Sequence, residues 1–276
     1  MKNVINSKTI PVLVVLTSLL AALFRLLTRG NGPDAAGLFE PRPGAWGLLW
    51  LTVALTALMI LFAVRKLRTP GTYQENYPKS APALVCSLPA AACMIVSGVS
   101  RLRLGMDPTA ITPDYIGVAT GILGAVAGGC LLLSGMNRIF ERKPFFVLNG
   151  LICLYFALRL FDRCREWSNE PQMGIVIFPF LASLAMMLTS YHRTCFDVEI
   201  GKRRVFLFWS LMGVQFSVVA MLSYEEPLFY GSCALWLLTD LCSLRPLRRR
   251  PVVAQPEETQ EEAPEETPEE TQEEAE

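Results

Sequence analysis

Charged residues and histidine are the side chains that this sequence has least of. Only 18% of its 276 residues are charged, while 52% are hydrophobic. A soluble domain of this length needs more charge than that to cover its surface. His192 is the only histidine, which excludes a metal or haem site built from several histidines.

The sequence also lacks the cysteine spacing and the catalytic sets that indicate other classes of protein. Its eight cysteines form no C-x-x-C pair, and most of them fall inside apolar runs. We interpret them as small buried hydrophobic residues. No nucleophile–base set and no phosphate-binding glycine loop is present. We therefore predict no catalytic residue, no metal and no cofactor, and we expect no nucleic acid as a partner.

Long hydrophobic runs are what the sequence has in abundance. A transmembrane helix needs roughly 20 mainly apolar residues, with a lower limit of about 17. The ranges that satisfy this are 10–27, 46–64, 81–99, 116–136, 145–161, 174–190, 205–222 and 228–244. We predict an all-α polytopic membrane protein whose residues 1–250 form a bundle of about eight transmembrane helices in the lipid bilayer.

Lysine and arginine are divided unequally between the two sides that this topology defines. The side that holds both termini carries 17 of the 25 basic residues, which leaves eight on the opposite side. Cytoplasmic loops of membrane proteins carry the excess of lysine and arginine. We predict a multi-pass protein of a bacterial cell membrane with both termini in the cytoplasm.

The end of the fifth predicted span, LRLFDRCREW at 158–167, alternates basic and acidic residues. At 100° per residue, four of its charged side chains share one face of the helix, namely Arg159, Asp162, Arg163 and Glu166, and Tyr155 continues that face one turn deeper. Arg25 and Glu226 lie on the same predicted side of the membrane. The candidate ligand-binding residues are therefore Arg25, Tyr155, Arg159, Asp162, Arg163, Glu166 and Glu226.

Two functions remain open for such a chain. Charges within membrane spans mark functional sites, so the leading hypothesis is recognition or transport of a small solute through a polar pocket that opens outward. The charges could instead neutralise one another at a helix end. In that case the protein is a non-catalytic membrane scaffold or sensor that acts through its cytoplasmic loops and acidic tail.

The fourth predicted span carries glycines along one face. Gly117, Gly121, Gly124 and Gly128 recur at steps of three and four residues. Glycine allows the backbones of two membrane helices to approach closely. The pattern predicts a helix-packing face, which serves either as a tightly packed seam or as a surface along which helices move.

A short internal match raises the question of a duplication. A shift of 134 residues places residues 25–29 over 159–163, so RLLTR lies over RLFDR. A parallel duplication of four plus four helices, 1–140 and 141–250, would explain the match. The alternative is coincidence, because leucine is abundant and membrane helices often end in arginine.

The C-terminal part changes from basic to acidic. We expect Asp240 to form an interfacial ion pair with Arg245, and we expect the basic cluster to bind anionic lipids of the inner leaflet. That cluster consists of Arg245, Arg248, Arg249 and Arg250. Residues 251–276 follow, with eleven glutamates and repeated proline and threonine. This composition cannot form a packed core and predicts a disordered cytoplasmic tail.

The boundary of the tail is testable by deletion. Removing residues 255–276 leaves every predicted span intact, so the shortened chain should insert into membranes as the full chain does. Fractionation of expressing cells, with alkaline carbonate extraction of the membranes, measures this. Loss of the shortened chain from the extracted membranes would place part of the membrane domain within the deleted residues.

Overall fold

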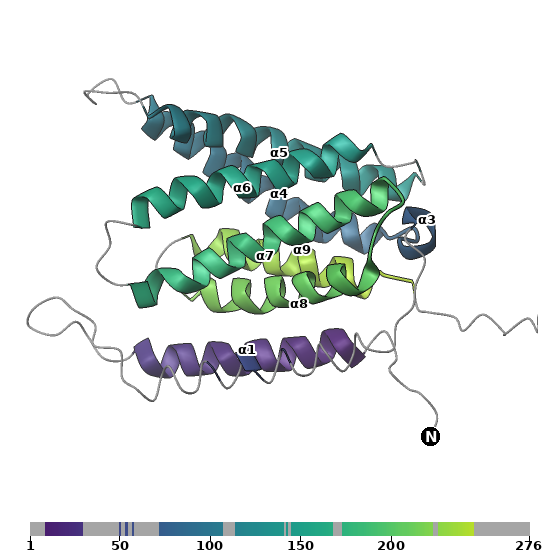
Figure 1. The fold of residues 1–276 in the computed structure, drawn as a ribbon, viewed down its shortest axis with the longest axis horizontal. Helices are drawn as coiled ribbons and strands as arrows, with labels where there is room; N and C mark the ends of the chain where they lie inside the picture. Colours follow the sequence, from purple (N-terminus) through teal and green to yellow (C-terminus); the bar gives the residue numbers. More distant parts are fainter. Residues whose placement is uncertain are drawn as a thin grey trace, which may run out of the picture. The chain divides into compact units, whose positions relative to one another are not determined.

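The computed structural model describes residues 9–29, 72–106, 114–140, 145–167, 173–222 and 226–245, together with positions 50, 53, 54, 57 and 142. Every regular element in this part of the chain is an α-helix, and no strand occurs among these residues (Figure 1). The described part of the chain is therefore all-helical, in agreement with the predicted fold class.

Each of the seven long helices overlaps one predicted span. The seven long helices are α1 (Thr9–Arg29), α4 (Ala81–Gly105), α5 (Tyr115–Ile139), α6 (Phe146–Trp167), α7 (Met173–Asp197), α8 (Arg203–Ala220) and α9 (Pro227–Cys242). A short helix of four residues, α3 (Tyr73–Asn76), precedes α4. The remaining predicted span, 46–64, lies largely outside the described residues. Helix α6 continues beyond the predicted limit at 161, so the whole charged stripe is helical.

Local sequence explains where the helices begin. Ser80 caps α4, since its Oγ accepts a hydrogen bond from the backbone N–H of Ala83 at 3.4 Å. Proline in the first turn of α4 and of α9 has no N–H that would need an intrahelical partner. Glu226, the N-cap residue of α9, has a φ of 46°, in the left-handed region. This conformation costs a residue with a side chain about 1 to 2 kcal/mol.

Six helices form a closed circuit of contacts. Each of α4 to α8 packs against the next helix in the chain, and α9 packs against both α8 and α4. Helix α1 packs mainly against α8, and it lies beside that helix in Figure 1. The core of the circuit holds large side chains with almost no exposed surface, including Trp236, Tyr155, Tyr230, Phe156 and Phe206.

Glycine brings α4 and α5 into backbone contact. A Cβ added to Gly98 of α4 would lie 2.6 Å from the carbonyl oxygen of Gly121, and one added to Gly124 would lie 3.0 Å from the Cα of Gly98. A Cβ on Gly128 would lie 2.7 Å from the carbonyl oxygen of Ala91. Rotation of a side chain cannot relieve a clash with backbone, so these positions require glycine for the observed separation of the two helices.

Two of the described helices, α4 and α5, are long and apolar enough to cross a membrane. They also carry large aliphatic side chains that the rest of the protein leaves exposed, among them Val96 and Ile122, and α1 exposes Leu16 and Leu23 in the same way. The chain therefore has two candidate membrane spans, and the count of eight stays a prediction.

Three further expectations fall wholly or partly on residues that the structure does not describe. The parallel duplication needs the span at 46–64, which lies largely outside the described part. The acidic tail, 251–276, and the arginines at 248–250 lie outside it as well. The duplication, the disorder of the tail and its lipid-binding cluster stay predictions.

The backbone contact between α4 and α5 predicts opposite effects when glycine is replaced by alanine at two different positions of α5. Gly121→Ala should lower the free energy of unfolding by about 1 to 3 kcal/mol, because the added methyl overpacks the interface. Gly129→Ala meets nothing within 4 Å and should stabilise the helix by roughly 1 kcal/mol through its helix propensity. Thermal unfolding of the purified variants measures both effects, and equal effects at the two positions would contradict the close contact.

Candidate functional site

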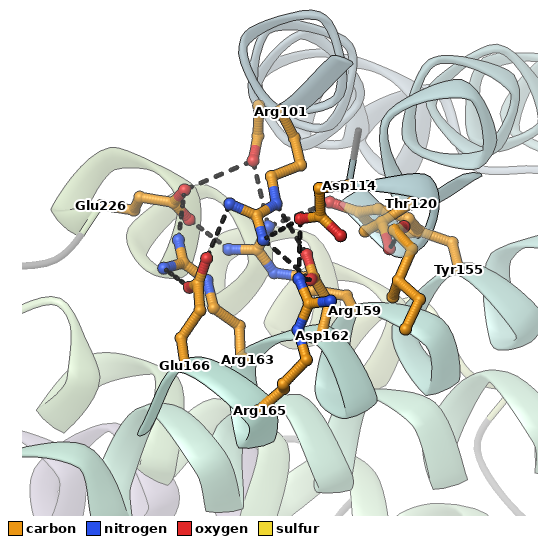
Figure 2. Close-up of polar contacts among 12 residues, drawn as sticks. Arg101, Asp114, Thr120, Tyr155, Arg159, Asp162, Arg163, Arg165, Glu166 and Glu226 are labelled. Atoms are coloured by element: carbon orange, nitrogen blue, oxygen red, sulfur yellow. Dashed lines mark hydrogen bonds and ion pairs between the residues drawn. The ribbon is translucent and has the colours of Figure 1, made fainter. Parts of the chain in front are cut away.

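Eight charged residues from four helices meet at one end of the helix circuit (Figure 2). We call them the α6 network, because α6 contributes five of them. Its members are Arg101, Asp114, Arg159, Asp162, Arg163, Arg165, Glu166 and Glu226. Four arginines and four carboxylates balance one another, so the network carries no net formal charge.

Asp162 is the most deeply buried carboxylate of the α6 network, with 2% of its surface exposed. Arg101 of α4 holds it with two hydrogen bonds, Nε to Oδ2 at 2.7 Å and Nη2 to Oδ1 at 2.8 Å. Arg101 also pairs with Glu166 at 2.6 Å and with Asp114 at 3.3 Å. One guanidinium therefore joins α4 to α6 and to the start of α5.

Asp114 is the N-cap residue of α5 and accepts a hydrogen bond from Arg165 at 2.7 Å. This bond is the largest cause that lowers the pKa of Asp114 below its ordinary value. The Asp114 carboxylate occupies space that a side chain at position 117 would fill, since a Cβ on Gly117 would lie 2.6 Å from Asp114 Oδ2. Of the glycines on the predicted face, this one contacts the ion-pair network.

Arg159 lies deeper than the other arginines of the α6 network and is 4% exposed. Its guanidinium carbon lies 4.0 Å from the centre of the Phe229 ring. It donates hydrogen bonds to Ser97 Oγ at 3.0 Å and to Tyr155 Oη at 3.4 Å. It also forms an ion pair with Glu226. The Nε of Arg159 is buried and has no hydrogen-bond partner among the described residues.

Glu226 joins α9 to α6. Besides Arg159, its carboxylate pairs with Arg163 at 2.9 Å and accepts a hydrogen bond from Ser97 at 3.4 Å. Burial by itself raises the pKa of Glu226, but the two guanidinium groups outweigh it and hold that pKa below its ordinary value. Glu226 is thus an anion at neutral pH that two arginines stabilise.

The structure brings six of the seven candidate residues together, namely Tyr155, Arg159, Asp162, Arg163, Glu166 and Glu226. Arg25 instead lies over the ring of Phe178 on α7, 5.5 Å from its centre. Sequence reasoning missed Arg101, Asp114, Arg165 and Ser97. Arg101 and Asp114 flank the connection between the third and fourth predicted spans, on the predicted outer side of the membrane. The charged residues of 158–167 are predicted on the same side, and this was the one indication in the sequence that the two groups could meet.

A second ion-pair network occupies the opposite ends of the helices. Asp240 of α9 accepts a hydrogen bond from Arg138 of α5 at 3.0 Å and pairs with Arg193 of α7. All three side chains are buried. The expected pair of Asp240 with Arg245 is therefore wrong: Asp240 points into the bundle, where two guanidinium groups neutralise it. We call Arg138, Arg193 and Asp240 the inner network.

The segment around α3 packs onto the inner network. The Tyr77 ring lies 4.9 Å from the guanidinium carbon of Arg138 and 5.8 Å from that of Arg193. Asn76 Oδ1 accepts a hydrogen bond from Arg203 at 3.0 Å. The Asn76 carbonyl oxygen accepts one from the backbone of Arg245 at 3.0 Å. These contacts attach residues 73–77 to the ends of α5, α7, α8 and α9.

Asp197 lies beside the inner network, at the end of α7 and beyond the predicted span 174–190. Its Oδ2 accepts a hydrogen bond from Asn149 at 2.6 Å. Burial raises the pKa of Asp197 to about 6, and the bond from Asn149 and the charge of Arg193 offset only part of this effect. Asp197 is therefore the group near this network whose charge changes in mildly acidic conditions.

Helix α8 also carries polar side chains that are buried in the protein. Three buried side-chain oxygens of α8 have no hydrogen-bond partner among the described residues: the Oγ atoms of Ser210 and Ser217 and the Oε1 atom of Gln215. Buried polar groups in folded proteins are normally paired with protein, water or ligand. A buried oxygen without a protein partner is a position at which a water molecule or a polar group of a solute can bind.

The pairing of Asp162 predicts unequal effects for two arginines that contact the same carboxylate. Arg101→Ala leaves buried Asp162 with only Arg165 at 3.4 Å and should cost about 3 kcal/mol of unfolding free energy. Arg165→Ala removes an exposed partner and should cost at most about 1 kcal/mol. Thermal unfolding of the two variants measures the difference. Equal destabilisation would show that Arg101 has no special role in holding α4 to α6.

No protein-family model, no curated protein and no solved structure matches this chain. Its function therefore has to be argued from the geometry of the two networks and from the buried polar groups of α8.

Proposed function

We propose that this protein is a multi-pass membrane protein that binds a small polar solute inside the helix circuit and transports it across the membrane. The solute enters at the α6 network, which faces outward, and leaves at the inner network, which faces the cytoplasm together with both termini. The membrane is a bacterial cell membrane. The observation that carries the proposal is the set of buried side-chain oxygens of α8 that have no partner among the described residues.

Exposed apolar surface supports the membrane location. Helices α1, α4 and α5 each carry several large aliphatic side chains that nothing in the described structure covers. Soluble monomers rarely expose apolar patches of that extent, whereas lipid chains are a suitable solvent for them. The bias of lysine and arginine toward the side of the inner network supports the orientation. Arg245 and residues 248–250 would then meet anionic lipid headgroups.

The unpartnered polar atoms support a solute-binding interior. Ser210 and Ser217 lie seven residues apart and so share one face of α8. A buried hydroxyl or amide without a partner costs about 1 to 3 kcal/mol. A solute with hydroxyl, amide or carboxylate groups would recover that free energy on binding.

The two ion-pair networks support a cycle in which each end of the path opens in turn. Both networks connect helices that are distant in the sequence, and the ion pairs of both are formed in this structure. A transporter needs a barrier on each side of its binding site. Exchange of ion-pair partners allows such a barrier to open without leaving a charge unpaired in an apolar environment.

A membrane scaffold or sensor is the alternative function. It is favoured by the complete pairing of the carboxylates of the α6 network, each of which contacts an arginine of that network. Under this alternative the networks only stabilise the fold. The cytoplasmic loops and the acidic tail would then bind the partner.

Transport is tested with purified protein in liposomes and a panel of labelled amino acids, organic acids, sugars and nucleosides. At least one of them should equilibrate faster than in protein-free liposomes. Ser217→Ala should slow this flux about tenfold, which corresponds to the loss of one hydrogen bond to the solute. Ser87→Ala is the matched control, because Ser87 is equally buried but already donates to the Leu84 carbonyl at 2.8 Å.

The two functions give different outcomes in this experiment. Flux that depends on Ser217 but not on Ser87 supports transport. If no solute crosses faster than in protein-free liposomes, transport is excluded. The scaffold function then predicts a co-purifying protein that is lost when residues 251–276 are deleted.

A further inference from the structure

We propose that the solute carries a carboxylate with a single negative charge, and that Arg159 binds it in place of the Glu226 carboxylate. The inference rests on the proposed function, since it names the chemical class of the solute bound at the α6 network. Glu226 then competes with the solute carboxylate for Arg159, and it pairs with Arg159 as long as no solute is bound.

Arg159 has the surroundings of an anion-binding residue. The Phe229 ring covers one face of its guanidinium, and the hydroxyls of Ser97 and Tyr155 hold one end of it. A stacked and oriented guanidinium presents two parallel N–H donors, which match the two oxygens of a carboxylate. The Nε–H of Arg159 is buried and unpartnered, so one donor of the fork is available to a ligand.

Glu226 is the carboxylate of the α6 network that is best placed to leave. Within the described residues, it is the only carboxylate that contacts Arg159. Its side chain is 32% exposed, whereas that of Arg159 is 5% exposed. It stands at the N-cap of α9 on a left-handed backbone. Asp162, in contrast, is held by two hydrogen bonds from Arg101. A solute that approaches this end meets Glu226 before Arg159.

Charge balance defines the class of solute. When Glu226 leaves, Arg163 keeps Glu166 at 2.9 Å, but Arg159 loses its one carboxylate partner. An unpaired buried guanidinium costs several kcal/mol, so the incoming solute must restore one negative charge. A neutral solute would leave Arg159 unpaired. A phosphate monoester, which carries about 1.5 to 2 negative charges near pH 7, would bring more charge than Arg159 can neutralise.

The experiment measures the thermal unfolding temperature of the purified protein in detergent at constant ionic strength. The probes are acetate and L-lactate, their neutral counterparts acetamide and L-lactamide, and methyl phosphate. The two carboxylates should raise the unfolding temperature of the wild type in a concentration-dependent way. The two amides and methyl phosphate should leave it unchanged. This arm needs no variant and decides the charge of the ligand by itself.

A second arm tests the exchange with Glu226. Glu226→Gln removes the competing charge and keeps the shape, so it should lower the acetate concentration for half-maximal stabilisation by about tenfold or more. Glu199→Gln is the matched control, because Glu199 also has a positive φ, of 64°, but is exposed and lies beyond the end of α7. It should leave the acetate concentration within about twofold of the wild type.

The outcomes separate this inference from the proposed function. Equal stabilisation by acetate and acetamide, or an unchanged acetate response in Glu226→Gln, overturns the inference. Carboxylate binding without flux in liposomes keeps the inference and overturns transport. Flux of a neutral solute without any carboxylate effect keeps transport and overturns the inference.

Discussion

Pairing of arginine with carboxylate across different helices is the interaction on which both ends of the helix circuit depend. At one end Arg101 and Arg159 join α6 to α4 and α9, and at the other Asp240 joins α9 to α5 and α7. An unpaired charge in apolar surroundings costs several kcal/mol. Each helix can therefore move only if its charge meets a new partner at the same time.

The two sides of the α6 network differ in how firmly their helices are held. Helices α4 and α5 touch through backbone at Gly98 and Gly121, and packed backbone resists displacement. That contact positions Arg101 for Asp162 and makes their pair a fixed part of the site. Glu226, the N-cap residue of α9, has no such backbone contact to hold it, and its left-handed conformation is already costly. This difference in support is the basis for proposing that Glu226 gives way to a solute carboxylate.

Sequence reasoning found the charged face of α6 because helical periodicity determines which residues of one helix share a face. It missed Arg101, which lies 61 residues before Asp162, because periodicity does not tell which helices are neighbours. It also assigned Asp240 to the nearby Arg245. The actual partners, Arg138 and Arg193, lie 102 and 47 residues away. Proximity in the chain was a poor guide once the side chain pointed into the bundle.

Composition and hydrophobic period alone determined the helices, their approximate bounds, the charged face of α6 and the polar character of the tail. Only the tertiary structure decided which helices are neighbours, which charges pair, and which buried hydroxyls are left without a partner. The physical reason is that apolar residues cover both the inside and the outside of these helices. Hydrophobicity then does not select one rotation of a helix about its axis, and the few polar contacts between helices make that choice.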